Sequence, residues 1–432
     1  MSMGAFALLL RWLPWWQAVV LAASALAFNL AVLPRFAHAL YRPGDRARSV
    51  HGIVFYPIAV LLLLLAFPRR PDISAAAWGI LAIGDGIATL AGRALGGPRW
   101  PWNREKTIAG SAAFAVGGAM AGVFLAWWCR PAMALPPAMV FTFTAPLAAA
   151  VVAALVESMP IRLDDNLSVA ASAGAVMALG TAVSLERLPA AAATVESRIL
   201  WALALNGVVA AAGYSARSVT VMGASIGALI GITVYASLGW QGWLLLLITF
   251  IAATAAARAG LKRKVVLGIA EERGGRRGPG NAIANTGLAA AAGTLALTGS
   301  SPDLAALAFT AALVAGGSDT IASEIGKAYG RTTVSIASLS RVPPGTSGAM
   351  SLEGTAAGIA GALGLAAIAA ALRLIHGEAI AVVAVAATIG SLVESWLGAT
   401  YEDAGILNND MLNFLNTAVA ALAALVLAAW MP

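Results

Sequence analysis

Cysteine, histidine and charged residues are scarce in this 432-residue sequence, and each scarcity excludes a class of protein. The single cysteine, Cys129, excludes an internal disulfide and a zinc site built from thiolates. The three histidines are too scattered for a histidine-rich metal site. Charged residues make up 11% of the chain and hydrophobic residues 60%, and the mean hydropathy is +0.83. A soluble protein of this length could not bury so much apolar surface, so the sequence predicts a membrane protein.

Two common nucleotide-binding motifs are also absent from the sequence. No Gly-x-x-x-x-Gly-Lys-Ser/Thr segment occurs, and the βαβ context of a Rossmann glycine motif is missing. The net charge of +7 is compatible with a nucleic-acid partner. In a protein with many membrane helices, however, such a charge more often marks loops held on the cytoplasmic side. We therefore expect no nucleic-acid partner.

Apolar segments long enough, or nearly long enough, to cross a bilayer recur along the whole chain. They predict about 14 transmembrane helices and hence an all-α polytopic membrane fold. The first segment is too long for a signal-peptide core and is expected to remain as a helix. The segments are centred on residues 7–33, 52–67, 74–92, 108–129, 132–156, 167–185, 199–215, 218–238, 242–258, 280–298, 304–323, 350–373, 377–396 and 411–431.

The distribution of Lys and Arg predicts which helix ends face the cytoplasm. With the N-terminus outside, 20 of the 27 Lys and Arg residues fall in inner loops and 7 in outer segments. This bias favours that orientation over its inverse. We therefore expect a multi-pass protein of the inner cell membrane, surrounded by membrane lipids, with its polar loops facing the cytoplasm. The longest polar segment, 258–279, is expected to be an exposed linker or a surface helix on anionic headgroups.

Two glycine-rich stretches resemble each other and place polar residues at this inner face. Each begins with an aspartate near the end of an apolar helix, Asp85 or Asp319. Each continues through a loop with Gly, Pro, Lys and Arg and re-enters an apolar helix through Gly and Ser. Four features in the same order predict a duplication, with parallel halves at 1–198 and 199–432. The further matches are His51 with Asn285, each 34 residues before its aspartate, Glu157-Ser158 with Glu394-Ser395, and 163–167 with 407–411.

Carboxylates within these apolar segments are candidates for chemistry, because a charged side chain costs about 2.5–3.5 kcal/mol in a membrane helix. Pairing with a nearby Arg or Lys is the alternative explanation for each of them alone. Together, beside the glycine-rich loops, they suggest Mg²⁺ held by one or two carboxylates and by substrate phosphates. The candidate catalytic residues are Asp85, Glu157, Asp164, Asp165, Asp319, Glu324 and Glu394, and the candidate metal ligands are Asp85, Asp165, Asp319 and Asp410.

The glycine-rich loops supply candidate contacts to phosphate. Glycine lets backbone N–H groups approach phosphate oxygens, helix N-termini add a positive dipole, and Lys and Arg neutralise charge. Ordinary anchoring on the inner side is the alternative role for these cations. The candidate nucleotide- and phosphate-binding residues are Gly92, Arg93, Asn103, Arg104, Lys106, Thr107, Gly110, Ser111 and Asn166 in the first half, and Asn285, Ser323, Lys327, Arg341, Pro344, Gly345, Thr346, Gly348, Ser351, Glu353, Asn409 and Asn413 in the second.

Phosphoryl transfer suits such a site, because the protein then mainly positions donor and acceptor and stabilises spreading negative charge. An alcohol acceptor benefits from a carboxylate base, whereas a phosphate acceptor is already anionic. The first half has two carboxylates in Asp164-Asp165-Asn166, and the second has one in Asn408-Asn409-Asp410. We therefore hypothesise that the first half accepts a neutral alcohol and the second half its monophosphate.

The motifs of the two halves resemble two families of membrane kinases. Residues of roughly 40–190 resemble the phytol kinase branch of the dolichol kinase-like enzymes, and residues of roughly 200–432 resemble the phytyl-phosphate kinase family of integral membrane proteins. The first resemblance rests on Asp85-x-x-Ala88-x-x-x-Gly92-Arg93, Asn103-x-x-Lys106-Thr107-x-x-Gly110-Ser111 and Asp164-Asp165-Asn166-Leu167. The second rests on Asp319-Thr320-x-x-Ser323-Glu324-x-Gly326, Pro343-Pro344-Gly345-Thr346-x-Gly348, Ser351-x-x-Gly354 and Asn409 to Asn413.

These resemblances imply a gene fusion with two kinase activities, CTP as the donor, and an isoprenoid alcohol and its monophosphate as acceptors. They also imply metal or triphosphate contacts for Asp85, Lys106, Asp319 and Lys327. The tryptophan-rich loop 97–102 departs from the pattern, and its contacts stay open. Two alternatives remain: a cytidylyltransferase that forms a CDP-lipid, and a lipid or isoprenoid transporter with duplicated helical halves. The polar residues gather at one membrane face rather than at the midplane, which favours an enzyme.

Overall fold

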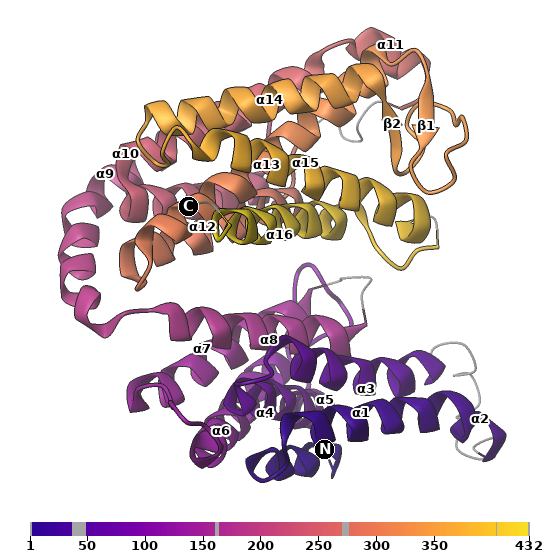
Figure 1. The fold of residues 1–432 in the computed structure, drawn as a ribbon, viewed down its shortest axis with the longest axis vertical. Helices are drawn as coiled ribbons and strands as arrows, with labels where there is room; N and C mark the ends of the chain where they lie inside the picture. Colours follow the sequence, from indigo (N-terminus) through magenta and orange to yellow (C-terminus); the bar gives the residue numbers. More distant parts are fainter. Residues whose placement is uncertain (1, 37–48, 160–163, 270–275, 403, 431–432) are drawn as a thin grey trace. The chain divides into compact units, whose positions relative to one another are not determined.

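The computed structural model describes residues 2–36, 49–159, 164–269, 276–402 and 404–430 of the chain. These residues are almost entirely helical and form two compact units, Met1–Ala182 and Val183–Pro432 (Figure 1). The division expected at residues 198–199 falls inside helix α9 (Leu188–Ser215).

The helices confirm an all-α polytopic membrane protein. Within the described residues, nine helices are long and apolar enough to cross a membrane, and Trp15–Ala31 and Ile53–Ala66 are shorter apolar helices. Every apolar segment expected from the sequence contains a helix. Two of these segments lie in one long helix, α10 (Val221–Arg258), which bends at Gly239, where a positive φ of 71° interrupts the helical backbone.

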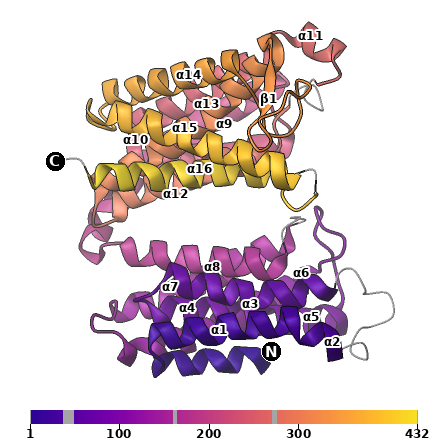
Figure 2. The same cartoon turned by 45° about the vertical axis from the view of Figure 1, so that its right-hand side comes forward.

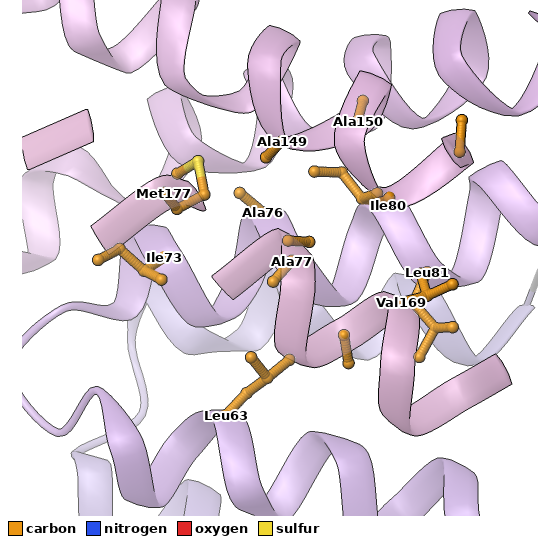
Figure 3. Packing of buried hydrophobic residues seen from close by; sticks show 14 of the residues in the cluster. Leu63, Ile73, Ala76, Ala77, Ile80, Leu81, Ala149, Ala150, Val169 and Met177 are labelled. Atoms are coloured by element: carbon orange, nitrogen blue, oxygen red, sulfur yellow. The ribbon is translucent and has the colours of Figure 1, made fainter. Parts of the chain in front are cut away.

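The first unit is a bundle in which small residues allow close helix packing. Ala76, Ala77, Ala149 and Ala150 lie in one buried cluster with Ile80 (Figure 3). A π-helical turn, Ile80–Gly84, directly precedes α5 and therefore places Asp85 at the start of that helix. The elements are a 3-10 helix (Ser2–Arg11), α1 (Trp15–Ala31), α2 (Leu33–Phe36), α3 (Ser49–Ala66), α4 (Pro71–Gly79), α5 (Asp85–Leu95), α6 (Ile108–Cys129), α7 (Met139–Ser158) and α8 (Asp165–Ala182).

The second unit is organised around α13 (Pro302–Tyr329), which is buried almost continuously from Leu307 to Asp319. This helix packs against α10, α12, α14, α15 and α16, and the helices lie side by side in two views (Figures 1 and 2). Asp319 is therefore held inside the bundle. The remaining elements are α11 (Leu261–Val266), α12 (Pro279–Thr298), β1 (Thr333–Ser335), β2 (Ala349–Ser351), α14 (Leu352–Ala371), α15 (Ala379–Leu397) and α16 (Asn409–Ala428).

A short hairpin marks the end of the second unit where α13 ends and α14 begins. Its strands β1 and β2 pair antiparallel, with Thr333 opposite Ser351. The hairpin and α11 lie at the same end of this unit (Figure 1). Since α14 starts directly after β2, the hairpin fixes the backbone at the helix N-terminus.

Candidate active sites

Both units contain a helix whose first turn is capped in the same way. In the first unit, Thr107 precedes α6, and its Oγ1 accepts a hydrogen bond from Gly110 N at 3.1 Å. In the second unit, Ser351 precedes α14, and its Oγ accepts a hydrogen bond from Gly354 N at 3.1 Å. Each cap satisfies a backbone donor that has no partner within the helix. The two stretches that resemble each other in sequence therefore share a local structure.

The capped glycine of each unit also touches the helix that carries the aspartate. A Cβ added to the glycine of α6 would lie 3.1 Å from the Ala88 carbonyl oxygen of α5, and one added to the glycine of α14 would lie 2.6 Å from the Ala322 carbonyl oxygen of α13. Asp85 and Asp319 each lie three residues before these alanines. Both aspartates are thus placed at the same point of the same helix contact.

Replacing the glycine of the second contact should disrupt it. We expect Gly354→Leu to push α14 away from α13, because its Cβ would lie 2.6 Å from a backbone oxygen. Overpacking costs about 1–3 kcal/mol, and each kcal/mol lowers the melting temperature by about 2–4 °C in a unit of this size. Gly364→Leu is the matched control, since nothing lies within 4 Å of a Cβ at Gly364 of the same helix. Equal melting temperatures for the two purified variants would contradict the contact.

Lys106 is the central cation of the first unit and lies one residue before the capping threonine. Its Nζ donates hydrogen bonds to Glu157 Oε1 and, at 3.0 Å, to Asp165 Oδ2. Burial disfavours the ammonium form, but the hydrogen bonds and charges of the two carboxylates outweigh it and raise the pKa of Lys106 above its usual value. The stabilising ion pairs are therefore present at neutral pH and are lost only as the pH rises through that raised pKa.

The acidic residues of the first unit gather around this lysine from three helices. Glu157 ends α7 and is buried, Asp165 begins α8, and the exposed Asp85 of α5 interacts electrostatically with Lys106 and Asp165. Asp164 has a different role, because its Oδ1 accepts hydrogen bonds from Asn166 N at 3.0 Å and Asn166 Nδ2 at 2.7 Å. Asp164 and Asn166 thus fix the start of α8, while the other three carboxylates line the candidate site.

The tryptophan-rich loop holds the ends of two helices. Trp100 Nε1 donates to Ser111 Oγ at 2.9 Å, and Trp102 Nε1 donates to Ser158 Oγ at 3.4 Å. The two rings stack with centroids 4.6 Å apart. The loop therefore joins the start of α6 to the end of α7, and Ser111 is a buried partner of Trp100.

The other candidates of the first unit lie as follows: Gly92 packs against Gly110, Arg93 and Arg104 are exposed, and Asn103 Oδ1 accepts a hydrogen bond from Glu105 N at 3.0 Å.

In the second unit, most of the candidate residues surround one cavity between α13, α14, α15 and the loop that precedes α14. The cavity has an empty volume of about 1260 Å³, which includes its mouth. The candidates that line it are Asp319, Ser323, Lys327, Gly345, Thr346, Gly348, Ser351, Glu394 and Asn409.

Two carboxylates reach this cavity from neighbouring helices. Asp319 of α13 is 7% exposed, and its Oδ1 accepts a hydrogen bond from Ser391 Oγ at 2.6 Å. Glu394 of α15 interacts electrostatically with Asp319. Its Oε2 is buried and has no hydrogen-bond partner among the described residues. The cavity lining therefore contains two carboxylates, the buried Asp319 and the half-buried Glu394.

Glu324 lies outside this cavity lining and forms a buried ion-pair network instead. Lys264 Nζ donates to Glu324 Oε2 at 2.6 Å, and Lys327 Nζ donates to Glu324 Oε1 at 2.8 Å. Lys264 is 1% exposed and also donates to the Ala257 carbonyl at 2.6 Å. Glu324 therefore holds Lys327, which lines the cavity. The position of Glu324 in an apolar segment already indicated a partner of opposite charge, because an unpaired charge there is costly.

The expectation that segment 258–279 is an exposed linker is wrong for Lys264. That residue enters the protein because Glu324 needs a cationic partner away from water. Its neighbours Lys262 and Arg263 in α11 are exposed, as expected. Residues 270–275 of the segment, and the side chain of His51, lie outside the described residues.

The remaining candidates of the second unit lie away from this cavity lining. Asn285 lines another, mostly apolar cavity of about 990 Å³ between α9, α10, α12 and α13. Asp410 lies beside α12, where a Cβ on Gly280 would be 2.1 Å from its Oδ2. The others are Arg341, exposed in the loop before β2, Pro344 in the same loop, Glu353, whose Oε1 lies 3.9 Å from Arg331 Nε, and Asn413, whose Nδ2 donates to the Asn409 carbonyl at 2.8 Å.

The carboxylates fit a cation that takes few protein ligands. Among the described residues, no group of three or more His, Cys, Asp and Glu side chains is arranged to hold a metal ion. Mg²⁺ is commonly bound by one or two carboxylates together with substrate phosphates and water. Asp319 and Glu394 supply two such carboxylates in the lining of one cavity.

The apolar helices identify a multi-pass membrane protein, and the polar cavity of the second unit is a candidate ligand site. The chain belongs to the family described as integral membrane protein DUF92, whose model matches residues 204–421.

Several curated proteins have similar sequences. An uncharacterized membrane protein of Synechocystis sp. is 39% identical over 196 residues, which cover 44% of this chain and 76% of that protein. Protein VTE6, chloroplastic, of Arabidopsis thaliana is 35% identical over 206 residues, 46% of this chain and 62% of that protein. Probable phytol kinase 3, chloroplastic, of Glycine max is 36% identical over 132 residues, 30% of this chain and 40% of that protein. The chain thus spans less than two thirds of the last two relatives. No solved structure matches the chain.

Proposed function

We propose that this chain is a bifunctional membrane kinase that phosphorylates an isoprenoid alcohol to its monophosphate and then to its diphosphate. The alcohol is of the phytol, geranylgeraniol or farnesol type, and CTP with Mg²⁺ supplies the phosphoryl group. The observation that carries the proposal is the repeated frame of a capped helix, a glycine contact and an aspartate, with a glutamate nearby in each unit. The likeness to a probable phytol kinase and to VTE6 supports an isoprenoid acceptor.

In this proposal the first unit phosphorylates the alcohol. The alcohol oxygen attacks the γ-phosphorus, the bond from that phosphorus to the β,γ-bridging oxygen breaks, and CDP leaves. Asp165 accepts the proton of the alcohol, because it is exposed beside Lys106, whereas Asp164 is engaged at the start of α8. Lys106 and the amides at the start of α6 balance the charge of the phosphates. When bound at Asp85, Mg²⁺ would neutralise phosphate charge.

The second unit would phosphorylate the monophosphate. An anionic phosphate oxygen attacks the γ-phosphorus and needs no base. Lys327, held by Glu324, and the backbone of the loop at Gly345 and Gly348 would contact the phosphates, since they line the cavity. Both glycines have positive φ, 87° and 67°, a backbone conformation that favours glycine. CDP again leaves, so each of the two reactions consumes one CTP.

The prenyl chain would leave this cavity sideways into the bilayer. Ile359 of α14 and Leu392 of α15 line the cavity and are also 40% and 39% exposed on the surface of the helices. An apolar chain between these side chains keeps its contact with lipid while its phosphate stays beside α13. We place both sites at the cytoplasmic face, where nucleoside triphosphates are available and where the Lys and Arg bias puts the loops.

The test incubates the purified protein with CTP, Mg²⁺ and a panel of prenyl alcohols of different chain length. We expect a monophosphate that accumulates first and a diphosphate that follows, with CDP formed in both steps. Pyrophosphate and a CDP-lipid in place of CDP would identify a cytidylyltransferase. Isoprenoid counterflow in liposomes without CTP turnover would identify a transporter, and either result would replace the proposal.

A further inference from the structure

One cation of the first repeated frame has no counterpart in the second. In the first unit, Lys106 precedes the capping residue and pairs with the buried Glu157. In the second unit, Met350 precedes the capping residue and lines the cavity. Glu394 corresponds to Glu157 in the sequence repeat, so the second unit has an equivalent carboxylate without an equivalent lysine.

The lysines near the second cavity are committed to another carboxylate. The Nζ atoms of Lys264 and Lys327 both bond to Glu324. Lys327 interacts electrostatically with Asp319, but among the described residues Asp319 and Glu394 form no ion pair within 4.0 Å. One oxygen of Glu394 also lacks any hydrogen-bond donor there. The buried Asp319 and the half-buried Glu394 therefore share one cavity, and neither forms an ion pair with a lysine there.

Burying such a pair is costly unless a cation joins it, because a buried charge without a partner loses its hydration. The cavity gives an ion access to the pair, since both residues line it and its mouth is open. The Ser391 hydroxyl donates a hydrogen bond to Asp319 Oδ1 and orients that carboxylate. Asp319 Oδ2 and Glu394 Oε2 are hard oxygen ligands of the kind that Mg²⁺ and Mn²⁺ bind.

We propose that Asp319 and Glu394 bind one divalent cation directly, before any nucleotide arrives, and that in the first unit Lys106 takes the place of this cation beside Glu157. Met350 in place of Lys106 then contributes to a difference in metal affinity between the two sites. This cation site stands apart from the kinase proposal, because it requires neither CTP nor a lipid acceptor. It would still serve phosphoryl transfer if both proposals hold.

The experiment measures Mn²⁺ binding to the purified full-length protein by electron paramagnetic resonance, without nucleotide and in a neutral detergent. We expect one bound Mn²⁺ per wild-type chain at the cavity, displaced by Mg²⁺. Asp319→Asn and Glu394→Gln should each weaken binding by more than about 10-fold, since each removes a charged ligand. Met350→Lys should weaken it similarly by placing an ammonium beside Glu394, as Lys106 lies beside Glu157.

Leu352→Lys is the matched control for the added charge. Leu352 is two residues from Met350, is 82% exposed and is not part of the cavity lining. Its Mn²⁺ affinity should stay within about twofold of wild type, because an exposed charge is screened by solvent. Glu394→Gln preserves shape and so tests the site even if Met350→Lys fails to fold. Wild-type protein without a bound Mn²⁺, or unchanged affinity in both Asp319→Asn and Glu394→Gln, would overturn the proposal and leave a carboxyl pair that shares a proton.

Discussion

Asp319→Asn should stop the conversion of a prenyl monophosphate to the diphosphate while the alcohol is still phosphorylated. The substitution removes the charge of the buried Asp319 from the second cavity but keeps the side-chain shape and the hydrogen bond from Ser391. Removing a preorganised electrostatic contact commonly lowers turnover by about 10²–10³-fold. The measurement supplies CTP with either the alcohol or the purified monophosphate and follows each product separately. The monophosphate should accumulate in the first case.

Asp85→Asn is the matched counterpart in the first unit. It should lower alcohol phosphorylation by a similar factor and leave the conversion of added monophosphate within about twofold of wild type, because the second unit has its own frame. An equal loss of both steps in both variants would contradict separate sites. It would indicate one shared reaction centre.

Lys264→Met should have the largest effect on stability. Its ammonium and Glu324 form a buried pair at 2.6 Å, and the lysine is 1% exposed. Removing one partner of a buried pair costs about 3–5 kcal/mol, because the remaining charge stays desolvated. We expect a clear fall in the melting temperature of the purified protein. Slower diphosphate formation should accompany it, since Lys327 is held by the same carboxylate.

Two comparisons separate this pair from general effects of the substitution. Lys262→Met changes an exposed lysine of the same short helix and should leave the melting temperature nearly unchanged. The double variant Lys264→Met/Glu324→Gln should recover part of the lost stability, because it removes the stranded charge as well. A single variant as stable as wild type would show that the pair contributes little.

The sequence predicted the helices well, because long apolar runs leave few alternatives in a membrane. It predicted two separate helices, 218–238 and 242–258, where the structure has one helix, α10, that bends between them at Gly239. Hydropathy did not reveal which polar residues meet. Lys264 and Glu324 lie 60 residues apart, and a basic run normally indicates a surface.

Only part of the candidate site could be predicted, because sequence motifs describe local stretches and not contacts between distant helices. Repeated motifs identified Asp85, Asp319 and the capping residues, because each local frame lies within a short stretch of sequence. Asn285 was included by its spacing from Asp319, yet it lines a different cavity. Spacing along the chain does not determine which face of α13 a neighbouring helix covers.

The most direct measurement uses CTP labelled with ³²P at either the γ or the α position, with a prenyl alcohol as the acceptor. We expect the γ label to pass to the lipid in both the monophosphate and the diphosphate, while the α label stays in CDP. Transfer of the α label to the lipid, with release of pyrophosphate, would contradict it.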